Sequence, residues 1–471
     1  MRRRSLLTLL CSLLLLAACA ETQPPPAAPP PPLFNTAHLD YLGEDVLHDG
    51  DTLRIIHLYA DAPDYAWVSD DDEGTACVDD AARAAVVYLR HYERTGNEAS
   101  RTHAEALLRF LLYMQRGDGL FYNFVWNNKL DINTEHENSR ADVFGWWAAR
   151  GVWALGTGAQ VLKTANPALA AEAAEAVRRT LPHLREVQKN YGATTVMGGR
   201  TLPRWLLYET ASDATSELML GLLAFQQTAP DTSVARLIDR FAEGMAMMQY
   251  GSMQVFPYGG HASWAESWHG WGNAQTMALA GTDRLETAVR EAEQFYARLL
   301  VEGWLHSIPF DHPEAIRTFE QIAYAVRGVS VGLVRLAEAT GEDRYARMAG
   351  LAASWLTGNN VARTPMYDAP TGRGYDGINS PTDVNHNAGA ESTIEALFTL
   401  LEVERNPEAR RWLFAQGAPP VQVEKGGKTY SYRVFTVASG AAPQRMAVVM
   451  NYTDEQTELL EGTALDAFLR N

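Results

Sequence analysis

The sequence predicts an all-α protein, an (α/α)6 toroid of six helical hairpins with a small C-terminal β appendage. Three observations lead to this prediction. Twelve helical patterns follow one another in six pairs. In each pair the first helix is rich in small and apolar residues, and the second has one apolar face and exposed charges. A polar loop precedes each first helix, as expected when six inner helices begin at the same end of a ring.

The helical patterns account for most of the chain. They lie near residues 77–95, 99–116, 139–163, 167–190, 212–228, 231–249, 269–280, 284–302, 319–340, 342–357, 388–404 and 407–415. Thr95-Gly96 and Thr340-Gly341 are typical helix ends, because glycine readily takes the left-handed conformation that follows many helices. A superhelix of helical repeats is the competing architecture, but its period should be shorter and steadier than the spacing in this chain.

Strands are expected on both sides of the helical region. LRIIHLYA predicts one strand before the first helix, and the alternating tail from residue 421 to 452 predicts two or three more. So few strands do not form a core of their own, so the tail is expected to pack outside the toroid, without a separate function. The expected boundaries are 34–416 for the toroid and 417–471 for the β-rich segment.

The first residues resemble an export signal. MRRRSLLTLLCSLLLLAAC has a basic start, an apolar run and small residues before Cys19. Residues 1–19 are therefore interpreted as a lipoprotein signal peptide whose lipobox ends in Cys19, the lipidated residue, and the proline-rich residues 20–33 as a stiff tether. An ordinary cleaved signal peptide is the alternative. Either interpretation predicts export, and the lipid anchor predicts attachment to the bacterial cell envelope, facing the periplasm or the exterior.

Composition narrows the classes of partner and cofactor. The net charge of −17 argues against nucleic acid, whose phosphates require a basic face. Without Cys11 and Cys19 the only cysteine is Cys77, so we expect no disulfide within the chain and a buried, inert thiol. The sequence contains no HExxH or GxxxxGK[ST] motif, and its GxSxG match, GVSVG at 328–332, lies inside the helix expected at 319–340 and not at a strand-to-helix turn. No metal and no cofactor are predicted.

The loops in front of the inner helices contain the candidate functional residues. Two of them read FPYGGHASWAESWHGWGN and GRGYDGINSPTDVNHNAGAE. All six contain carboxylates, and most add aromatic residues or histidine. Sugars stack on aromatic rings and exchange hydrogen bonds with acids and amides. A single aspartate in such a loop is more often a helix cap, but six such loops at one end predict a carbohydrate cleft.

Four stretches of the chain resemble a known superfamily. VDDAARA, ENSRADVFGWWAARGVWALG, YDAPTGRGYDGI and NHNAGAESTIEAL are similar to motifs of the six-hairpin glycosidase superfamily. Within it they look most like the helical domain accompanying some bacterial glycosyltransferases and mannoside-processing enzymes, over residues 65–405. The related pattern has Asp-Ser-His-Gly-Arg where this chain has NSRAD at 138–142, which leaves open which carboxylate of this segment points inward. The superfamily includes hydrolases and sugar epimerases, so the resemblance implies a fold rather than one reaction.

Glycoside hydrolysis requires one protonated carboxyl and one carboxylate. Asp80 and Glu137 are the predicted catalytic pair, because both precede inner helices of adjacent hairpins. The predicted substrate-binding residues are Trp126, Asp142, Trp264, Glu266, Trp268, His269, Glu320, Asp376, Asn385, His386 and Glu391. Four of these, Glu266, Glu320, Asp376 and Glu391, are also alternative catalytic carboxylates.

The favoured function is an exported glycoside hydrolase that cleaves an oligo- or polysaccharide by general acid and base catalysis. A carbohydrate-binding lipoprotein without turnover is one alternative, and a sugar epimerase or lyase of the same fold is another. Epimerases of this fold generally act through histidines, and the resemblance offers few candidates here: His136, His261, His269 and His386.

Overall fold

The computed structural model of the chain describes residues 32–438 and 443–470. The predicted signal peptide, Cys19 and nearly all of the tether lie outside the described residues, and these assignments stay predictions. Within the described ranges, no helix has both the length and the apolar character that crossing a membrane requires.

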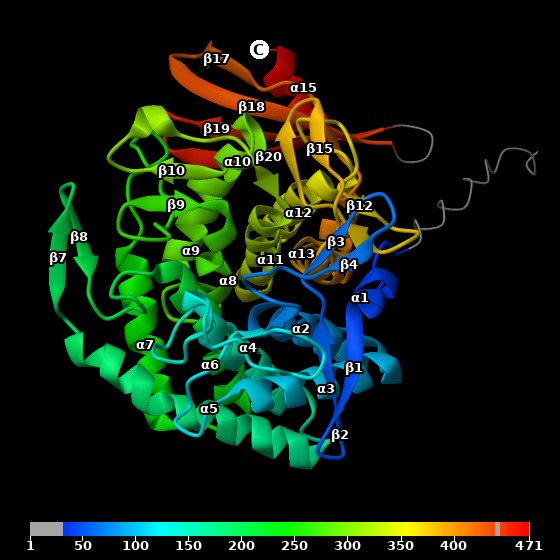
Figure 1. The fold of residues 1–471 in the computed structure, drawn as a ribbon. Helices are drawn as coiled ribbons and strands as arrows, with labels where there is room; N and C mark the ends of the chain where they lie inside the picture. The colour runs from blue at the N-terminus through cyan, green and yellow to red at the C-terminus, as the bar shows by residue number, and fades with distance from the viewer. Residues whose placement is uncertain (1–31, 439–442, 471) are drawn as a thin grey trace, which may run out of the picture.

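Six helices form a closed ring of contacts, each touching the next and the last touching the first (Figure 1). They are α2 (Val78–Thr95), α4 (Trp146–Val161), α6 (Ser212–Thr228), α8 (Gln275–Leu279), α11 (Ala323–Thr340) and α13 (Ala390–Glu404). Small residues let neighbouring helices of the ring approach closely. A Cβ added at Gly156 of α4 would lie 2.2 Å from the backbone oxygen of Gly221 in α6. The predominantly helical character and the pairing of helices agree with the sequence prediction.

A second set of helices packs against the ring, one beside each ring helix. They are α3 (Glu98–Met114), α5 (Pro167–Val187), α7 (Thr232–Met247), α9 (Leu285–Glu291), α12 (Asp343–Ala353) and α14 (Pro407–Trp412). A π-helical turn, Ala292–Tyr296, joins α9 to α10 (Ala297–Glu302). Gly96 and Gly341 end α2 and α11 in the left-handed conformation, with φ of 69° and 72°. Two short helices, α1 (Ala37–Leu42) and α15 (Gly462–Arg470), were not predicted.

Two ring helices begin six or more residues later than the sequence pattern predicts, and α11, expected from residue 319, begins at Ala323. The helix expected from residue 139 starts at Trp146, because the Ser139 hydroxyl accepts hydrogen bonds from the backbone N–H groups of Asn123 and Phe124 and holds this segment as a loop. The helix expected from residue 269 starts at Gln275, because β9 (Ser267–His269) pairs with β10 (Ser307–Pro309). Both differences come from partners that are distant in sequence.

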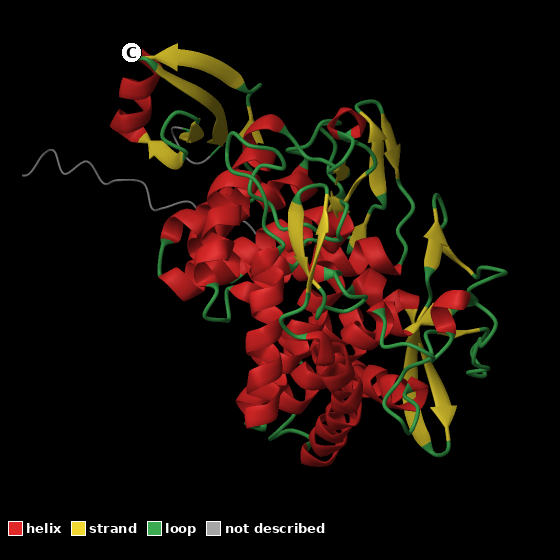
Figure 2. Cartoon of the chain, turned by 90° about the vertical axis from the view of Figure 1, so that its left-hand side faces the viewer, coloured by secondary structure: helices red, strands yellow, loops and turns green. Residues whose placement is uncertain are grey.

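Short antiparallel strands and loops cover one end of the ring (Figure 2). The chain pairs β1 (Gly43–His48) with β2 (Asp51–Ile56), β3 (Tyr59–Asp61) with β4 (Ala66–Val68), β5 (Ala76–Cys77) with β6 (Phe124–Val125), β7 (Thr194–Met197) with β8 (Arg200–Pro203) and β12 (Tyr367–Asp368) with β13 (Arg373–Gly374). A three-stranded sheet contains β11 (Gln321–Ile322), β14 (Gly377–Ser380) and β15 (Asp383–Asn385).

Neighbouring entrance loops contact one another around the whole ring. Strand pairs β5–β6, β9–β10 and β11–β14 join three neighbouring pairs of loops. The Tyr208 side chain packs on Gly145, and the backbone N–H of Ser212 donates to Ser263. The N–H of Ala390 donates to the backbone oxygen of Leu58, so the sixth entrance loop contacts the first. The six loops therefore meet at one end of the helical ring.

The C-terminal segment forms a larger sheet than predicted. Its strands are β16 (Gln416–Gly417), β17 (Val421–Lys425), β18 (Lys428–Val437), β19 (Gln444–Asn451) and β20 (Gln456–Glu461). Two glycines with positive φ, Gly426 and Gly427, form the tight turn between β17 and β18. One side of the sheet packs on α10, and α15 contributes Leu465 to a small cluster with Ala447 and Val449.

Candidate active site

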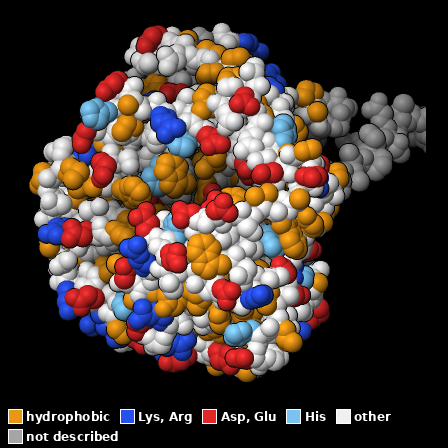
Figure 3. Space-filling model, viewed as in Figure 1, with side chains coloured by type: hydrophobic (Ala, Val, Ile, Leu, Met, Phe, Trp, Pro, Cys, Tyr) orange, Lys and Arg blue, Asp and Glu red, His pale blue; other side chains and the backbone are white. Residues whose placement is uncertain are grey.

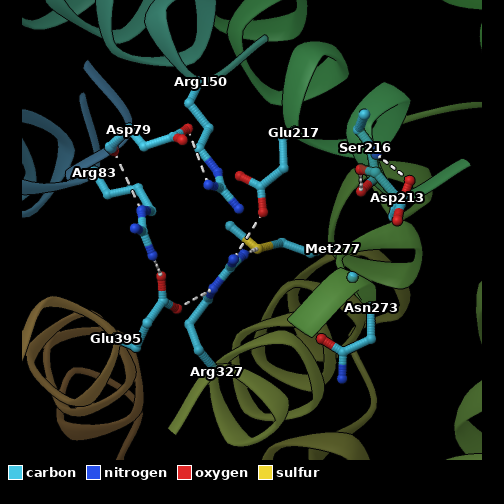
Figure 4. A network of polar contacts seen from close by, with 12 residues as sticks. Asp79, Arg83, Arg150, Asp213, Ser216, Glu217, Asn273, Met277, Arg327 and Glu395 are labelled. Atoms are coloured by element: carbon cyan, nitrogen blue, oxygen red, sulfur yellow. Dashed lines mark hydrogen bonds and ion pairs between the residues drawn. The ribbon is translucent and has the colours of Figure 1, made fainter. Parts of the chain in front are cut away.

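A chain of buried ion pairs lies at the centre of the helical ring (Figure 4). Glu395 of α13 lies 2.8 Å from Arg83 Nη1 and 2.6 Å from Arg327 Nε. Arg327 also lies 2.7 Å from Glu217 of α6. Burial alone would raise the pKa of Glu217, but Arg327 and Arg150 outweigh that effect and hold it below its usual range. The network connects four of the six ring helices through side chains that are almost fully buried.

Glu391 lies one helical turn before Glu395, at the end of the ring where the loops meet. Its side chain is 53% exposed, and its Oε2 lies 3.8 Å from Arg83 Nη2. Water reaches the carboxyl, but the surrounding protein displaces much of the remaining solvent and raises the pKa of Glu391 to about 7. Arg83 opposes this rise, and the nearby Asp80 charge adds to it. A carboxyl with this pKa can donate a proton at neutral pH.

Asp80 shares Arg83 with Glu391 but is buried. The same nitrogen, Arg83 Nη2, lies 2.6 Å from Asp80 Oδ1. The second oxygen, Oδ2, accepts a hydrogen bond from the thiol of Cys77 at 3.4 Å, and burial raises the pKa of Asp80. Both oxygens of Asp80 are therefore engaged, an arrangement that favours positioning Arg83 over direct contact with a substrate. Cys77 is buried, as the sequence predicts.

Asp79, the neighbour of Asp80, is more accessible. Its side chain is 20% exposed, and Oδ1 accepts a hydrogen bond from Arg150 at 2.9 Å. The Arg150 guanidinium lies over the ring of Trp146, and the rings of Tyr324 and Trp146 thus enclose it from two sides. Arg83 also lies over Tyr324, 4.7 Å from the ring centre. Both guanidinium groups therefore lie near the Tyr324 ring, and each is also close to an accessible carboxylate.

An aromatic pocket adjoins these charges. Trp146, Tyr208 and Trp264 line a cavity of about 380 Å³, together with Glu266. Trp264 is 41% exposed, so its ring face is available to a ligand. The face that carries the loops is hollowed across its middle, with acidic and hydrophobic side chains around the hollow (Figure 3). A pocket with exposed aromatic rings and a few polar groups suits a sugar.

Two residues predicted to bind substrate are buried. Trp268 is 1% exposed and packs edge-on against Phe295, so it is a core residue and not a stacking surface. The sequence could not distinguish it from its neighbour Trp264, since both lie in the same aromatic loop. His269 is also buried, with Nε2 3.1 Å from Asp213 and its ring stacked on Trp271 at 4.0 Å. This geometry favours support of Trp271 over contact with a ligand.

The loop before α13 contains three predicted residues. Asp376 accepts hydrogen bonds from the Ser392 hydroxyl at 2.7 Å and from the Gly389 N–H, so it holds the start of α13. Burial raises the pKa of Asp376. Asn385 reaches Asp376 at 3.5 Å, and the exposed His386 packs edge-on against Tyr375. Asp376 and Asn385 therefore help to position Glu391 through the helix that carries it.

The remaining predicted residues lie around the rim. Glu137 is exposed in a short 3-10 turn, Glu137–Ser139, and makes no hydrogen bond or ion pair to Asp80 within the described ranges. Asp142 is also exposed, and Trp126 is half-buried. The Glu320 side chain is half-buried and lies against Gly377. The predicted pair Asp80 and Glu137 thus consists of one buried and one exposed carboxylate.

Known structures share this architecture, although no protein-family model and no curated protein sequence matches the chain. Cellobiose 2-epimerase from Bacillus thermoamylovorans B4167 matches 74% of this chain and 92% of its own, with a TM-score of 0.53 and 11% identity. A D-mannose isomerase matches 74% of this chain and 90% of its own, with a TM-score of 0.50 and 12% identity. This chain has the six-hairpin glycosidase-like fold. Identity this low establishes the fold and not the reaction.

Five charged residues at the centre of the ring were not predicted from the sequence as site residues. Arg83, Arg150, Glu217, Arg327 and Glu395 each interrupt an otherwise apolar ring helix. Such a charge must face a partner across the ring, and this signal was present in the sequence. The sequence gives less indication that Tyr208 lines the pocket, because this residue lies in a loop whose path depends on its packing. The described residues contain no group of three or more His, Cys, Asp or Glu side chains suited to holding a metal ion.

Proposed function

We propose that this chain is a glycoside hydrolase, an (α/α)6 toroid exported to the bacterial cell envelope, in which Glu391 is the general acid. One observation carries the proposal: a half-exposed carboxyl with a pKa of about 7 beside a guanidinium, at the end of the ring that contains an aromatic pocket. Catalytic acids are commonly tuned toward neutral pH by burial and neighbouring charges.

The reaction requires two carboxyl groups with different protonation states. Glu391 donates its proton to the glycosidic oxygen as the bond to the sugar carbon breaks. Asp79, oriented by Arg150, takes a proton from the water that attacks that carbon. Arg83 then stabilises the Glu391 carboxylate left by proton transfer. Trp264 and Tyr208 stack on the sugar, while Asp80 keeps Arg83 in place and Glu137, Asp142 and Trp126 extend the rim.

The anchor completes the proposal. Lipidation of Cys19 would attach the enzyme to a membrane, and the proline-rich segment would hold the catalytic domain away from it. Cys19→Ala should abolish the incorporation of a labelled fatty acid into the protein. Incorporation of the label into the variant would contradict the anchor.

A reducing-end assay over a panel of neutral and acidic polysaccharides tests the activity. The full chain is compared with Glu391→Gln, Asp79→Asn and the control Glu338→Gln, an exposed glutamate of α11 at the opposite end of the ring. We expect wild type and control to release reducing ends, and the two site variants to lose most of this activity. Equal release by all four proteins would refute the site, and binding without release would favour the binding lipoprotein.

An epimerase is the second candidate, because the similar structures include a cellobiose 2-epimerase and a D-mannose isomerase. The assay distinguishes the two reactions when it is repeated on disaccharides in D₂O. An epimerase would produce a new stereoisomer carrying deuterium at the inverted carbon and would leave the glycosidic bond intact. A hydrolase would produce monosaccharides instead.

A further inference from the structure

A second cavity lies where the helical ring meets the C-terminal sheet. Its volume is about 660 Å³, within the range of small-ligand sites. Apolar walls come from Trp304, Phe319 and the consecutive prolines Pro419 and Pro420. Three arginines also line it: Arg298 of α10, Arg363 after α12 and Arg433 of β18.

Two of these arginines lack a carboxylate partner. The Arg363 guanidinium donates to the Gln416 side chain and to the backbone oxygen of Gly417. Arg433 donates to the backbone oxygens of Ala418 and Leu300. Within the described ranges neither forms an ion pair, whereas Arg298 is paired with Glu302. An acidic protein thus contains a partly enclosed pocket with an uncompensated positive charge.

The two unpaired guanidinium groups also affect each other. Burial is the main cause that lowers the pKa of Arg433 to about 10, and the charge of Arg363 adds to it. The pocket therefore places two arginine side chains without a carboxylate partner near each other. Nearby like charges at a partly desolvated site would be relieved by a bound anion.

We propose that this pocket binds the carboxylate of an acidic sugar residue, a uronate, in a glycan chain. A guanidinium group matches the planar geometry of a carboxylate, and the phenylalanine and proline walls suit a pyranose ring. The loop that enters α11 lines this pocket with Phe319 and Gln321, and Glu320 between them lies beside Gly377 of the next entrance loop.

The test measures binding by calorimetry on the full chain, with trigalacturonic acid as the probe. Its methyl ester, which has the same rings without the charge, is the matched ligand control. Arg433→Met and Arg363→Gln remove the charges while keeping an unbranched stem, and Arg445→Met removes an arginine from β19 of the same sheet outside the pocket. Thermal unfolding of each variant verifies that it is folded.

We expect the acid to bind at least about tenfold more tightly than the ester. Each pocket variant should bind the acid about tenfold or more weakly than wild type does. Arg445→Met should bind as wild type does. Because the experiment measures binding and not bond cleavage, its outcome is separate from that of the active-site proposal. Equal affinity for acid and ester would overturn the proposal. So would unchanged binding by a folded variant that carries both Arg433→Met and Arg363→Gln. Displacement of the probe by inorganic phosphate at equal concentration would overturn the uronate assignment, since the pocket would then recognise any anion.

Discussion

Glu391 and Glu395 lie one turn apart on α13, and Arg83 contacts both, yet the two glutamates are in different environments. Glu395 is 2% exposed and pairs with two arginines at 2.8 and 2.6 Å. Glu391 is half-exposed, and one of those arginines lies 3.8 Å away. Glu395 is held in place within the core by its two arginine partners, and Glu391 can exchange a proton with a ligand in the hollow.

The comparison shows how one helix provides both structure and chemistry. Full burial with two short ion pairs makes a charge expensive to remove, because its partners would be left unpaired in the core. Partial burial with one distant partner shifts a pKa without fixing the protonation state. The buried network below Glu391 also keeps Arg83 in place. The ion pair between Arg83 and Glu395 therefore positions Arg83 beside Glu391.

The largest expected effect is on stability and comes from Glu395→Gln. This change leaves Arg83 and Arg327 without a shared counter-charge, and it should lower the free energy of unfolding by about 3–5 kcal/mol. Urea denaturation measures the loss. Glu338→Gln, on the exposed end of α11, should change stability by less than about 0.5 kcal/mol. Equal midpoints for the two variants would show that the network contributes little.

The next effect is on turnover and comes from Glu391→Gln. Loss of the general acid should reduce kcat by about 10²–10⁴, with the fold intact. In wild type, activity should fall as pH rises through about 7, because Glu391 then loses the proton that it must donate. If Glu391→Gln and Glu395→Gln both lost stability and activity to the same degree, the two glutamates would not differ in role.

A smaller effect is expected at the aromatic wall. Trp264→Ala removes an exposed ring from the pocket and should lower kcat/KM by about fivefold to tenfold, mainly through KM. Tyr191 is similarly exposed at 40% but lies outside this pocket, and Tyr191→Ala should leave kcat/KM unchanged. A loss of kcat alone in Trp264→Ala would mean that this ring does not act by binding.

The smallest effect is expected at Glu137. This exposed side chain has no ion pair within the described ranges, so Glu137→Gln should change stability by less than about 0.5 kcal/mol. Initial rates with the same substrate should also stay close to wild type. A loss of activity as large as that of Glu391→Gln would restore Glu137 as a catalytic residue.

The sequence predicts the order of helices well, because hydrophobic periodicity and helix ends are local properties. It places two helix starts too early, since Ser139 and β9 are held by partners far away in the chain. The sequence indicates Glu391 only as one of several candidate carboxylates. Glu391 differs from Asp80 in its exposure to solvent, which depends on the three-dimensional packing around the hollow. Trp264 and Trp268 have the same local pattern and opposite exposure, which only packing against Phe295 decides.

Stability as a function of pH tests the claim about Glu391 most directly, because it needs no substrate. The folded-state pKa of Glu391, about 7, lies above the value of an unfolded glutamate, so the folded chain holds this proton more tightly. The carboxyl therefore favours folding at low pH, and this contribution disappears as pH rises from about 4.5 to 7. Glu391→Gln has no such proton, so its melting temperature relative to wild type should rise across that window and level off above it. A difference that stays constant between pH 4 and 9 would contradict the account.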